Sequence, residues 1–447
     1  MMRRLYATAA MILAAASLGF AQAKPGPLPD RIIFDTRMQE DIGLRDAAEG
    51  KTDFFFQNIT GPTLKALPAE VRAKLDSYAV PESSWSLQLN PYPNKAPYQG
   101  KVEGKAVFNP FAVREIRYAV NWLVDRKRIV DEVLDGEGGP MFTPMTPGQP
   151  GTYKFNLVAS KLGMTARGNE KKAIAEIEAA MKAAAELPEN RGKLAKNGQF
   201  WTFEGQPVTI RFMIRVDDPN GRLRVGRYIA DQLEKAGIKV ERLEWDRAKC
   251  FDFLDDDPAK LGWSMYTEGW GAGATRAYWD ISVSQMYAPY YGQLPGGNRE
   301  GFWSFEHKEI DDLAQKCING QFLDAAEYWK DNLRAVELGL KDSVRINLTY
   351  SLSYFTVNKA RFNARFPYGL GDGPNRWSTI GADVKPDAKG ERTLRTTLFS
   401  ARGALFMSAW DPVGPGGFSD TYIRAIVDPV TDPANFEAPN SALDTPL

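Results

Sequence analysis

One stretch in the middle of the chain predicts a strand, a helix and a second strand in direct succession. Residues 208–216 alternate apolar and polar side chains, as a half-buried strand does. Residues 222–236 then predict a helix, whose apolar face consists of Val225, Ile229 and Leu233. Gly237 is placed to cap this helix, and residues 238–243 predict the next strand. A βαβ unit of this kind constrains the chain to an α/β fold.

A second unit of the same kind lies near the N-terminus. Residues 31–35 predict a short strand, and residues 40–49 predict a helix that ends at Gly50. Residues 53–56 (Asp-Phe-Phe-Phe) then form a compact apolar strand. This order again predicts a crossover connection of the α/β type.

Further elements are expected between and after these units. One long helix is predicted after the turn at residues 108–111, with apolar residues at helical spacing from 116 to 133, and it ends at the glycines of residues 136–139. The Pro- and Gly-rich residues 140–150 predict an irregular loop that could cross between two lobes. Residues 171–187 predict a charged surface helix. The remaining elements are helices at residues 306–317 and 322–340 and an apolar strand at 345–350.

The length and charge of the chain limit its class. Its 447 residues are too many for one compact core, so two lobes are expected. Lys+Arg and Asp+Glu number 56 each, and this balance gives no basic excess for nucleic acid. The 11 Trp, 17 Tyr and 24 Phe exceed what a core needs, and such a surplus can line a binding cleft or be absorbed by burial.

The N-terminus has the pattern of a secretory signal peptide. Arg3 and Arg4 precede an apolar run at residues 5–20, and Ala21-Gln22-Ala23 then provides a small-residue cleavage site. Cleavage after Ala23 is predicted, with an uncleaved N-terminal anchor as the alternative. No cysteine stands at the cleavage point to carry a lipid, so a periplasmic location is expected.

Two cysteines, Cys250 and Cys317, allow two interpretations. They could pair in an oxidising compartment, but sequence spacing does not show whether their Cα atoms approach closely enough. Each also lies in a stretch predicted to be helical, where a buried free thiol is equally consistent.

Several motifs together resemble a known family of binding proteins. They occur in register between Ile32 and Pro367, at residues 46–53, 117–126 with 133–136, 230–240, and 297–298 with 305–313. The segment Arg-Tyr-Ala-Val-Asn-Trp-Leu-Val-Asp-Arg at residues 117–126 resembles the signature helix of the family 5 solute-binding proteins, the peptide- and nickel-type receptors of ABC importers.

The resemblance implies a fold, a function and a partner. It implies an α/β fold with two lobes of the periplasmic-binding-protein type, of the class with an extra subdomain. The lobes close on a small solute, with a peptide as the leading expectation, and the protein delivers it to an ABC permease in the membrane. We expect a monomer, without a cofactor or metal, divided into residues 1–23 (signal peptide), 24–112 (first lobe), 113–350 (α/β lobe) and 351–447 (return to the first lobe and tail).

Two parts of the chain depart from the family pattern. Little between Lys24 and Ile32 corresponds to the strand-rich opening of family members. The tail from Leu405 to Pro429 instead resembles that opening, displaced to the C-terminus. The sequence therefore predicts a rearranged order or an incomplete lobe.

Residues 263–280 are the predicted wall of the ligand cleft, because they combine aromatic side chains, glycines and charges. The predicted ligand-binding residues are Tyr266, Glu268, Trp270, Gly271, Trp279, Asp280 and, from a separate segment, Asn298. A buried strand and turn with packed aromatics is the alternative. Gly273 stands where peptide-binding members resemble G-W-x-x-D, whose aspartate pairs with the peptide amine. Glu268 or Asp280 is expected to substitute for it, unless the ligand lacks a free amine.

Charged residues of the signature helix have simpler interpretations. Arg114 and Arg117 could face an anionic group, although arginines on a helix surface are usually solvated or ion-paired. Asp125 and Arg126 are expected to have a structural role, in an ion pair.

Enzymatic activity has little support in the residue pattern. His307 is the single histidine and is expected to face solvent at a helix start, and no H-E-x-x-H motif or cysteine cluster exists. A secreted carbohydrate-active hydrolase needs only two carboxylates and is the main alternative function. A secreted adhesion module is a third possibility. Binding without catalysis is the prediction.

Overall fold

The computed structural model describes most of the chain. The described residues are 26–271 (apart from 38, 148, 150 and 255), 283, 286–288, 307–367, 374–398, 435–437 and 444–446.

A nine-stranded mixed sheet is the centre of the fold. Its path runs β1 (Arg31–Thr36), β14 (Thr393–Leu398), β2 (Phe54–Thr60), β13 (Arg345–Asn358), β3 (Leu75–Leu89), β12 (Met265–Gly271), β10 (Thr209–Arg215) and β11 (Lys239–Trp245), with β6 (Gly138–Pro140) beside β13. Both ends of the sheet are parallel, and the pairs in the middle are antiparallel.

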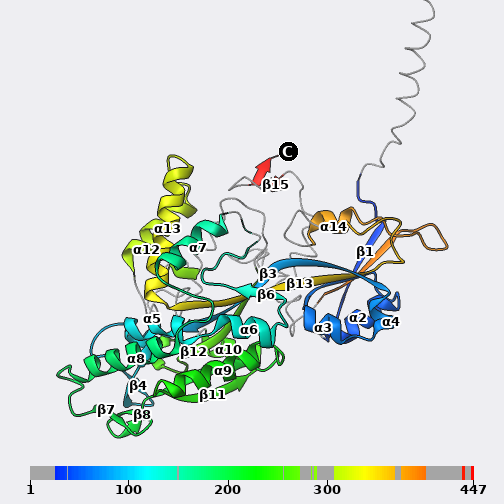
Figure 1. Ribbon diagram of the computed structural model, residues 1–447. Coiled ribbons are helices and arrows are strands. Elements are labelled where there is room, and N and C mark those ends of the chain that lie inside the picture. The colour runs from blue at the N-terminus through cyan, green and yellow to red at the C-terminus, as the bar shows by residue number, and fades with distance from the viewer. Residues whose placement is uncertain are drawn as a thin grey trace, which may run out of the picture.

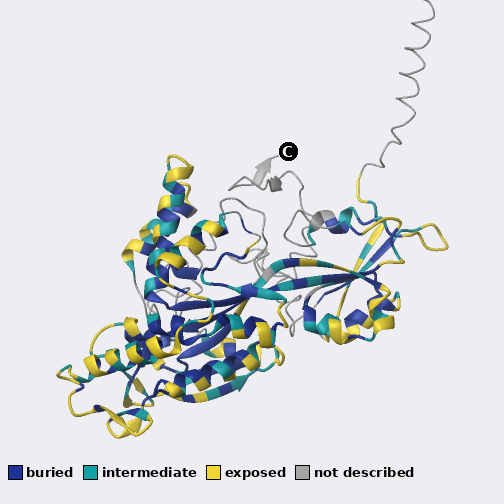
Figure 2. Cartoon of the chain, in the orientation of Figure 1, coloured by how far each residue is buried: buried dark blue, intermediate teal, exposed yellow. Residues whose placement is uncertain are grey.

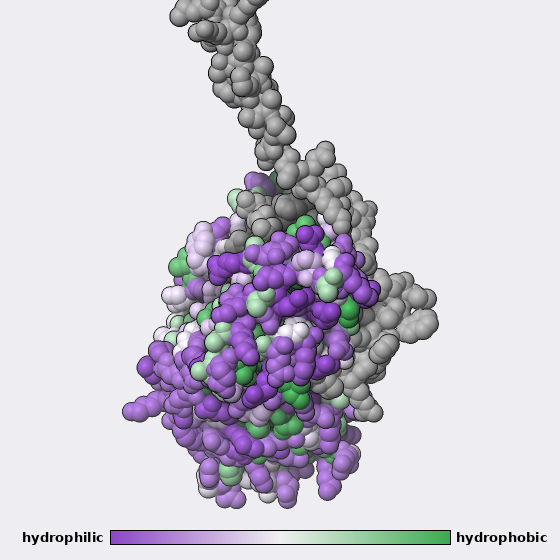
Figure 3. All heavy atoms as spheres, turned by 90° about the vertical axis from the view of Figure 1, so that its right-hand side faces the viewer, coloured by the Kyte–Doolittle hydropathy of each residue, from purple (hydrophilic) through white to green (hydrophobic). Residues whose placement is uncertain are grey.

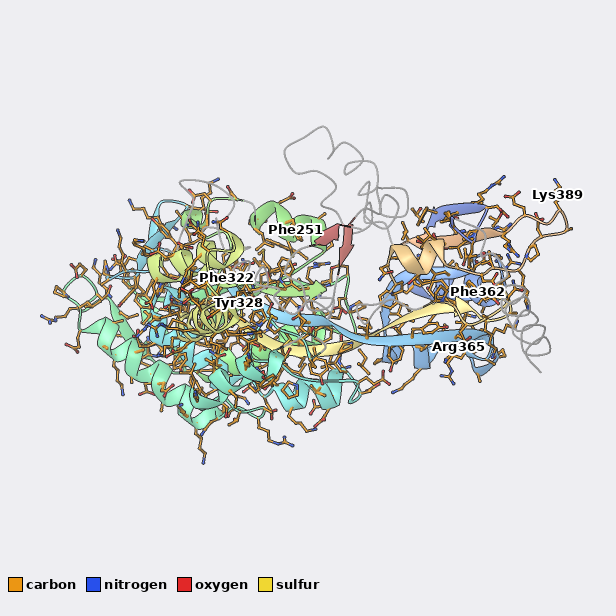
Figure 4. All side chains as sticks on the ribbon, turned by 90° about the horizontal axis from the view of Figure 1, so that it is seen from above. Phe251, Phe322, Tyr328, Phe362, Arg365 and Lys389 are labelled. Carbon is orange, nitrogen blue, oxygen red and sulfur yellow. The ribbon has the colours of Figure 1, made fainter. Side chains whose placement is uncertain are left out.

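Two long strands, β3 and β13, connect two lobes. Figure 1 shows them running from a larger body, which holds β10–β12 and most helices, to a smaller body with β1, β2 and β14. Each lobe has hydrophobic clusters of its own. The view from above separates Phe251, Phe322 and Tyr328 in the larger lobe from Phe362 and Arg365 in the smaller one (Figure 4). The predicted segment boundaries at residues 112 and 350 stay predictions.

The smaller lobe contains the predicted N-terminal crossover, with one difference. α2 (Glu40–Ala48) connects β1 to β2 as expected, but β14 lies between the two strands and is parallel to both. The buried Asp53 stabilises this arrangement, because its carboxylate accepts from Arg361 Nε at 2.5 Å and from the Arg395 amide at 2.8 Å. The lobe is completed by α3 (Gly61–Ala66), α4 (Ala69–Arg72) and α14 (Arg376–Ile380).

The larger lobe confirms the central βαβ unit. β10 and β11 are parallel, in register from Thr209↔Lys239 onward, and α9 (Arg222–Lys235) connects them. Its predicted apolar face is fully buried, and Gly237 takes a left-handed φ of +87° after it.

The prediction of one long helix at residues 116–133 was wrong. The structure has α5 (Arg114–Leu123) and α6 (Arg126–Val133), separated by the extended Val124 and Asp125. Asp125 begins the second helix as its N-cap, where its carboxylate accepts from the Arg128 amide at 2.8 Å. The break lets the Arg126 side chain enter the protein interior.

Helices cover both faces of the sheet in the larger lobe (Figure 2). α5, α9 and α8 (Glu170–Ala185) share one cluster with β3, β10 and β13, so α8 buries one face and exposes the others. α7 (Thr152–Lys161), α12 (Lys308–Ile318) and α13 (Ala325–Asp342) form a second cluster. The remaining short elements are α10 (Arg247–Leu254), η1 (Pro110–Ala112), η2 (Pro258–Lys260), β4 (Gln99–Val102), β5 (Lys105–Phe108), β7 (Leu194–Asn197), β8 (Phe200–Phe203), β9 (Gln206–Pro207), β15 (Asn435–Glu437) and β16 (Asp444–Pro446).

Cys250 and Cys317 are both buried free thiols, which decides between the two interpretations of the cysteines. Among the described helices, none combines the length and the apolar composition needed to cross a membrane. The described surface seen from the side of the smaller lobe is mostly hydrophilic, with apolar groups scattered over it (Figure 3).

Acidic side chains lie where the two lobes approach each other on the side of α3. Glu137, just after α6, packs its carboxylate against Gly61 and pairs with Lys65, both in α3. Glu40 of the smaller lobe is close enough to Asp218 of the larger lobe for mutual repulsion. Burial, and then this repulsion, raise the pKa of Glu40 to about 7.

Glu40 predicts a pH dependence of stability. Its pKa of about 7 in the fold exceeds the ordinary 4.5, so the folded chain binds more protons between these values. The free energy of unfolding should therefore fall by about 2 kcal/mol as the pH rises through this window. Urea denaturation at pH 5 and pH 8 should show that Glu40→Gln removes this part of the dependence. The exposed Glu70→Gln is the control, and equal pH profiles for both variants would contradict the assignment.

Candidate ligand-binding site

A row of side chains crosses the centre of the sheet where β12 ends. Trp270 lies opposite Ser84 of β3, and Ser84 lies opposite Tyr350 of β13. Tyr350 in turn lies opposite Gly139 of β6, and its ring fills the space that a Cβ at Gly139 would need. Directly opposed residues project to the same face, so Trp270, Ser84 and Tyr350 share one surface.

This row marks the transition from interior to surface. Trp270 and Tyr350 are half-buried, as is Phe142 in the loop after β6. Trp270 and Phe142 both pack against the cluster formed by α7, α12 and α13. The three aromatic rings therefore offer partly exposed apolar surface beside the two strands that connect the lobes.

Deeper on the same face lies a buried ion pair. Glu268 of β12 is 5% exposed and Arg345 of β13 is 1% exposed. Arg345 Nε donates to Glu268 Oε2 at 2.6 Å and Arg345 Nη2 donates to Oε1 at 2.8 Å. Ser86 of the intervening β3 donates to the same Oε2 at 2.6 Å. This bidentate pair joins three strands and compensates both charges.

Asn347 connects the ion pair to its surroundings. Its side-chain amide donates to the Phe142 carbonyl and to the Tyr287 hydroxyl, each at 3.3 Å. The Arg345 guanidinium carbon lies 5.9 Å from the centre of the Trp270 ring, and Arg345 Nη1 donates to the Met286 carbonyl at 2.6 Å. The polar groups and the aromatic rings therefore form one continuous site.

Arg117 and Arg126 are fully buried and do not lie on the helix surface. Arg117 donates to the Phe111 and Asp342 carbonyls at 2.7 and 2.8 Å, so it joins the backbone of η1 to the end of α13. Arg126 donates to the Asn347 carbonyl at 2.8 Å and stacks on Phe142, with 4.9 Å from guanidinium carbon to ring centre. Burial lowers the pKa of each to about 10, so both stay charged at neutral pH.

The predicted site residues fall into three groups. Trp270 is half-buried on the row, and Gly271 is the last residue of β12 beside it. Tyr266 and Glu268 are buried, Tyr266 with its hydroxyl accepting from Arg215 at 3.0 Å. Trp279, Asp280 and Asn298 lie outside the described residues, as does Gly273. Because Arg345 occupies both oxygens of Glu268, this carboxylate is engaged within the protein.

Sequence reasoning missed the contribution of β13. Residues 345–350 were predicted as an apolar strand, yet Arg345, Asn347 and Thr349 alternate with apolar residues and are all buried. The alternation of polar with apolar residues was the available signal, because a central strand that is buried on both faces usually has a continuous apolar sequence. Phe142 and Tyr350 carried no local motif.

His307 is less exposed than expected. It is the N-cap of α12, where Nδ1 accepts from the Ile310 amide at 3.3 Å, and Nε2 lies 3.4 Å from Asp342 Oδ2. Burial raises the pKa of Asp342. Across the described part of the chain, no three His, Cys, Asp or Glu side chains gather as a metal site would require.

A family model matches the chain over residues 22–286, more than half of its length. Its description is bacterial extracellular solute-binding proteins, family 5, middle region. The chain belongs to this family. The predicted family is thereby confirmed. No curated protein matches the sequence.

Solved structures of solute-binding proteins share the fold. NikZ from Campylobacter jejuni in complex with Ni(L-His) has a TM-score of 0.52 and 16% identity, covering 72% of this chain and 55% of its own. The oligopeptide-binding protein AppA from Bacillus subtilis, in complex with a nonapeptide, has a TM-score of 0.54 and 15% identity, and the match covers 78% of this chain and 59% of AppA. A mannohexaose-bound oligopeptide-binding protein from Thermotoga maritima has a TM-score of 0.54 and 18% identity, and the match covers 77% of this chain and 59% of that protein.

These likenesses establish the predicted α/β fold of two-lobe binding proteins for this family 5 chain. The chain spans just over half the length of the solved structures it matches.

The ion pair at the centre of the site should be essential for stability. Glu268→Gln leaves Arg345 buried without its carboxylate, and the free energy of unfolding should fall by about 3 kcal/mol. The double variant Glu268→Gln/Arg345→Met should recover most of this loss, because it removes the uncompensated charge. Urea denaturation measures both. The exposed Glu241→Gln is the control, and a single-variant loss no greater than the control's would contradict the role of the pair.

Proposed function

We propose that this protein is the extracytoplasmic solute-binding component of an ABC importer. It captures a peptide or a similar small solute between its lobes and delivers it to a membrane permease. The observation that supports this most is the row Trp270–Ser84–Tyr350, which places half-buried aromatic surface beside the two strands that connect the lobes. Aromatic faces with a few polar anchors are typical of sites that bind small molecules.

The connecting strands are suited to lobe closure. The pairing of β13 with β3 shifts register between Asn347 and Thr349 and again between Ser351 and Ser353. Such β-bulges bend a strand locally, and they lie where β13 leaves the larger lobe. A hinge made of a few residues is sufficient for closure around a ligand.

We propose binding without catalysis. Among the described side chains of the row and of the buried polar group beneath it (Glu268, Arg345, Ser86 and Asn347), Glu268 carries the one carboxylate, and Arg345 holds it. A glycoside hydrolase needs two carboxylates flanking the scissile bond. The engaged state of Glu268 supports a solute that is held and released unchanged. We further propose a monomer that is exported to the periplasm, with the signal peptide removed after Ala23.

The first experiment is a ligand screen on the purified protein. Its thermal unfolding is followed with peptides, oligosaccharides, amino acids and nickel–histidine. Three of these kinds of ligand, a peptide, an oligosaccharide and a nickel–histidine complex, are bound in the solved structures of similar fold. A ligand at one hundred times its Kd should stabilise the fold by about 2.7 kcal/mol. Saturable stabilisation without turnover supports the proposal, whereas turnover of a bound oligosaccharide would favour the hydrolase.

Trp270 should contribute directly to affinity. Trp270→Ala should weaken binding of the ligand found in the screen by about tenfold or more, because a central aromatic contact is lost. Isothermal titration calorimetry measures the affinity, and circular dichroism checks the fold. Tyr153→Ala is the control, since Tyr153 is 66% exposed on α7. Unchanged affinity in a folded Trp270→Ala variant would place the site elsewhere.

A further inference from the structure

Beneath the row Trp270–Ser84–Tyr350 lies a floor of buried polar side chains. They are Glu268, Arg345, Ser86, Asn347, Arg126 and Tyr287. This floor carries more positive than negative charge. Two guanidiniums, Arg345 and Arg126, lie there, against the single carboxylate of Glu268. Arg126 donates to the carbonyl of Asn347, and Arg345 lies two residues before Asn347 on β13, so the two arginines belong to one group of side chains. Counting the described residues of this floor, one positive charge remains after the ion pair is formed.

Arg126 is the source of this excess. Its hydrogen bonds all go to neutral acceptors, namely the carbonyls of Met141, Asn347 and Asn121 and the Asn121 side-chain oxygen. In the described part of the chain no carboxylate pairs with it. The half-buried ring of Phe142 lies over its guanidinium. A buried charge is screened little by solvent, so its field extends to the surface above it.

The remaining polar groups of the floor are donors. The Trp270 indole Nε1–H is buried and has no acceptor within the described structure. The Tyr287 hydroxyl accepts from Asn347, which leaves its own proton free to donate. Burial raises the pKa of Tyr287, so this hydroxyl keeps its proton at neutral pH. Both groups are buried, so their donor hydrogens act on a solute above the row through positive partial charge, which favours acceptor oxygens.

We infer that the solute presents an anionic oxygen group, such as a carboxylate, to this floor, and that a free amine is not what the site selects. The inference rests on the proposed function and names the class of its ligand. Positive potential and unpaired donors both favour a negatively charged acceptor. Glu268 offers no counter-charge for an amine, because Arg345 holds both of its oxygens.

Matched ligand pairs test this directly. The probes are N-acetyl-trialanine and its C-terminal amide, trigalacturonate and its methyl ester, and succinate and succinamide. The members of each pair differ chiefly in negative charge. Affinity is measured by calorimetry with the whole protein at low and at moderate salt. In every pair that binds, the anionic member should bind about tenfold more tightly, and the preference should shrink as salt is added.

A charge placed in the row provides the matched variants. Ser84→Asp adds a carboxylate between Trp270 and Tyr350, and Ser84→Asn has nearly the same shape without the charge. The ratio of affinities within a pair should fall about tenfold in Ser84→Asp and stay unchanged in Ser84→Asn. Using the ratio removes any general loss of affinity caused by the larger side chain.

The outcomes separate this inference from the proposed function. Saturable binding that is equal within each pair, or tighter for the neutral member, overturns the inference and leaves a solute-binding protein. Equal ratios in the two Ser84 variants overturn it as well. Absence of saturable binding by every probe in a folded protein counts against both.

Discussion

The buried ion pair between Glu268 and Arg345 is the interaction on which the centre of this protein depends. It spans β12, β3 and β13, and Ser86 of the middle strand completes it. Hydrophobic packing covers the opposite face of the same strands, where Leu87 and Ile346 are buried. A sheet with one apolar and one polar face needs its buried charges compensated, and this pair provides the compensation. The aromatic row of the binding site stands at the edge of that polar face.

Much of the fold was accessible from local pattern. The unit β10–α9–β11 follows from periodicity and from Gly237, because each signal lies within a few residues of the element that it defines. The position of β14 between β1 and β2 was not accessible, since no local feature encodes which distant strand fills that place. The break between α5 and α6 was missed because apolar spacing continues across it, although Asp125 is a good N-cap residue.

The site was predictable where it is local and unpredictable where it depends on register. Trp270 and Gly271 were identified from their own segment, which forms the end of β12. Whether Glu268 is free or engaged depends on Arg345, and this pairing follows from two strands aligned across a third. Arg126 was expected in an ion pair, but its partners are neutral oxygens of Met141, Asn347 and Asn121. Such long-range contacts determine the charge that a solute meets.

The two bulges in the pairing of β13 with β3 also bear on how such a chain can vary in length. Successive side chains of a strand alternate between faces, so one inserted or deleted residue exchanges the faces of everything that follows. Arg345 and Asn347 lie before the bulges, and Phe355 and Val357 of the smaller-lobe core lie after them. A change of one residue between Asn347 and Ser353 would turn one of these sets to the wrong side. This stretch should therefore keep a fixed length among close relatives, while the surface loops are free to grow and shrink.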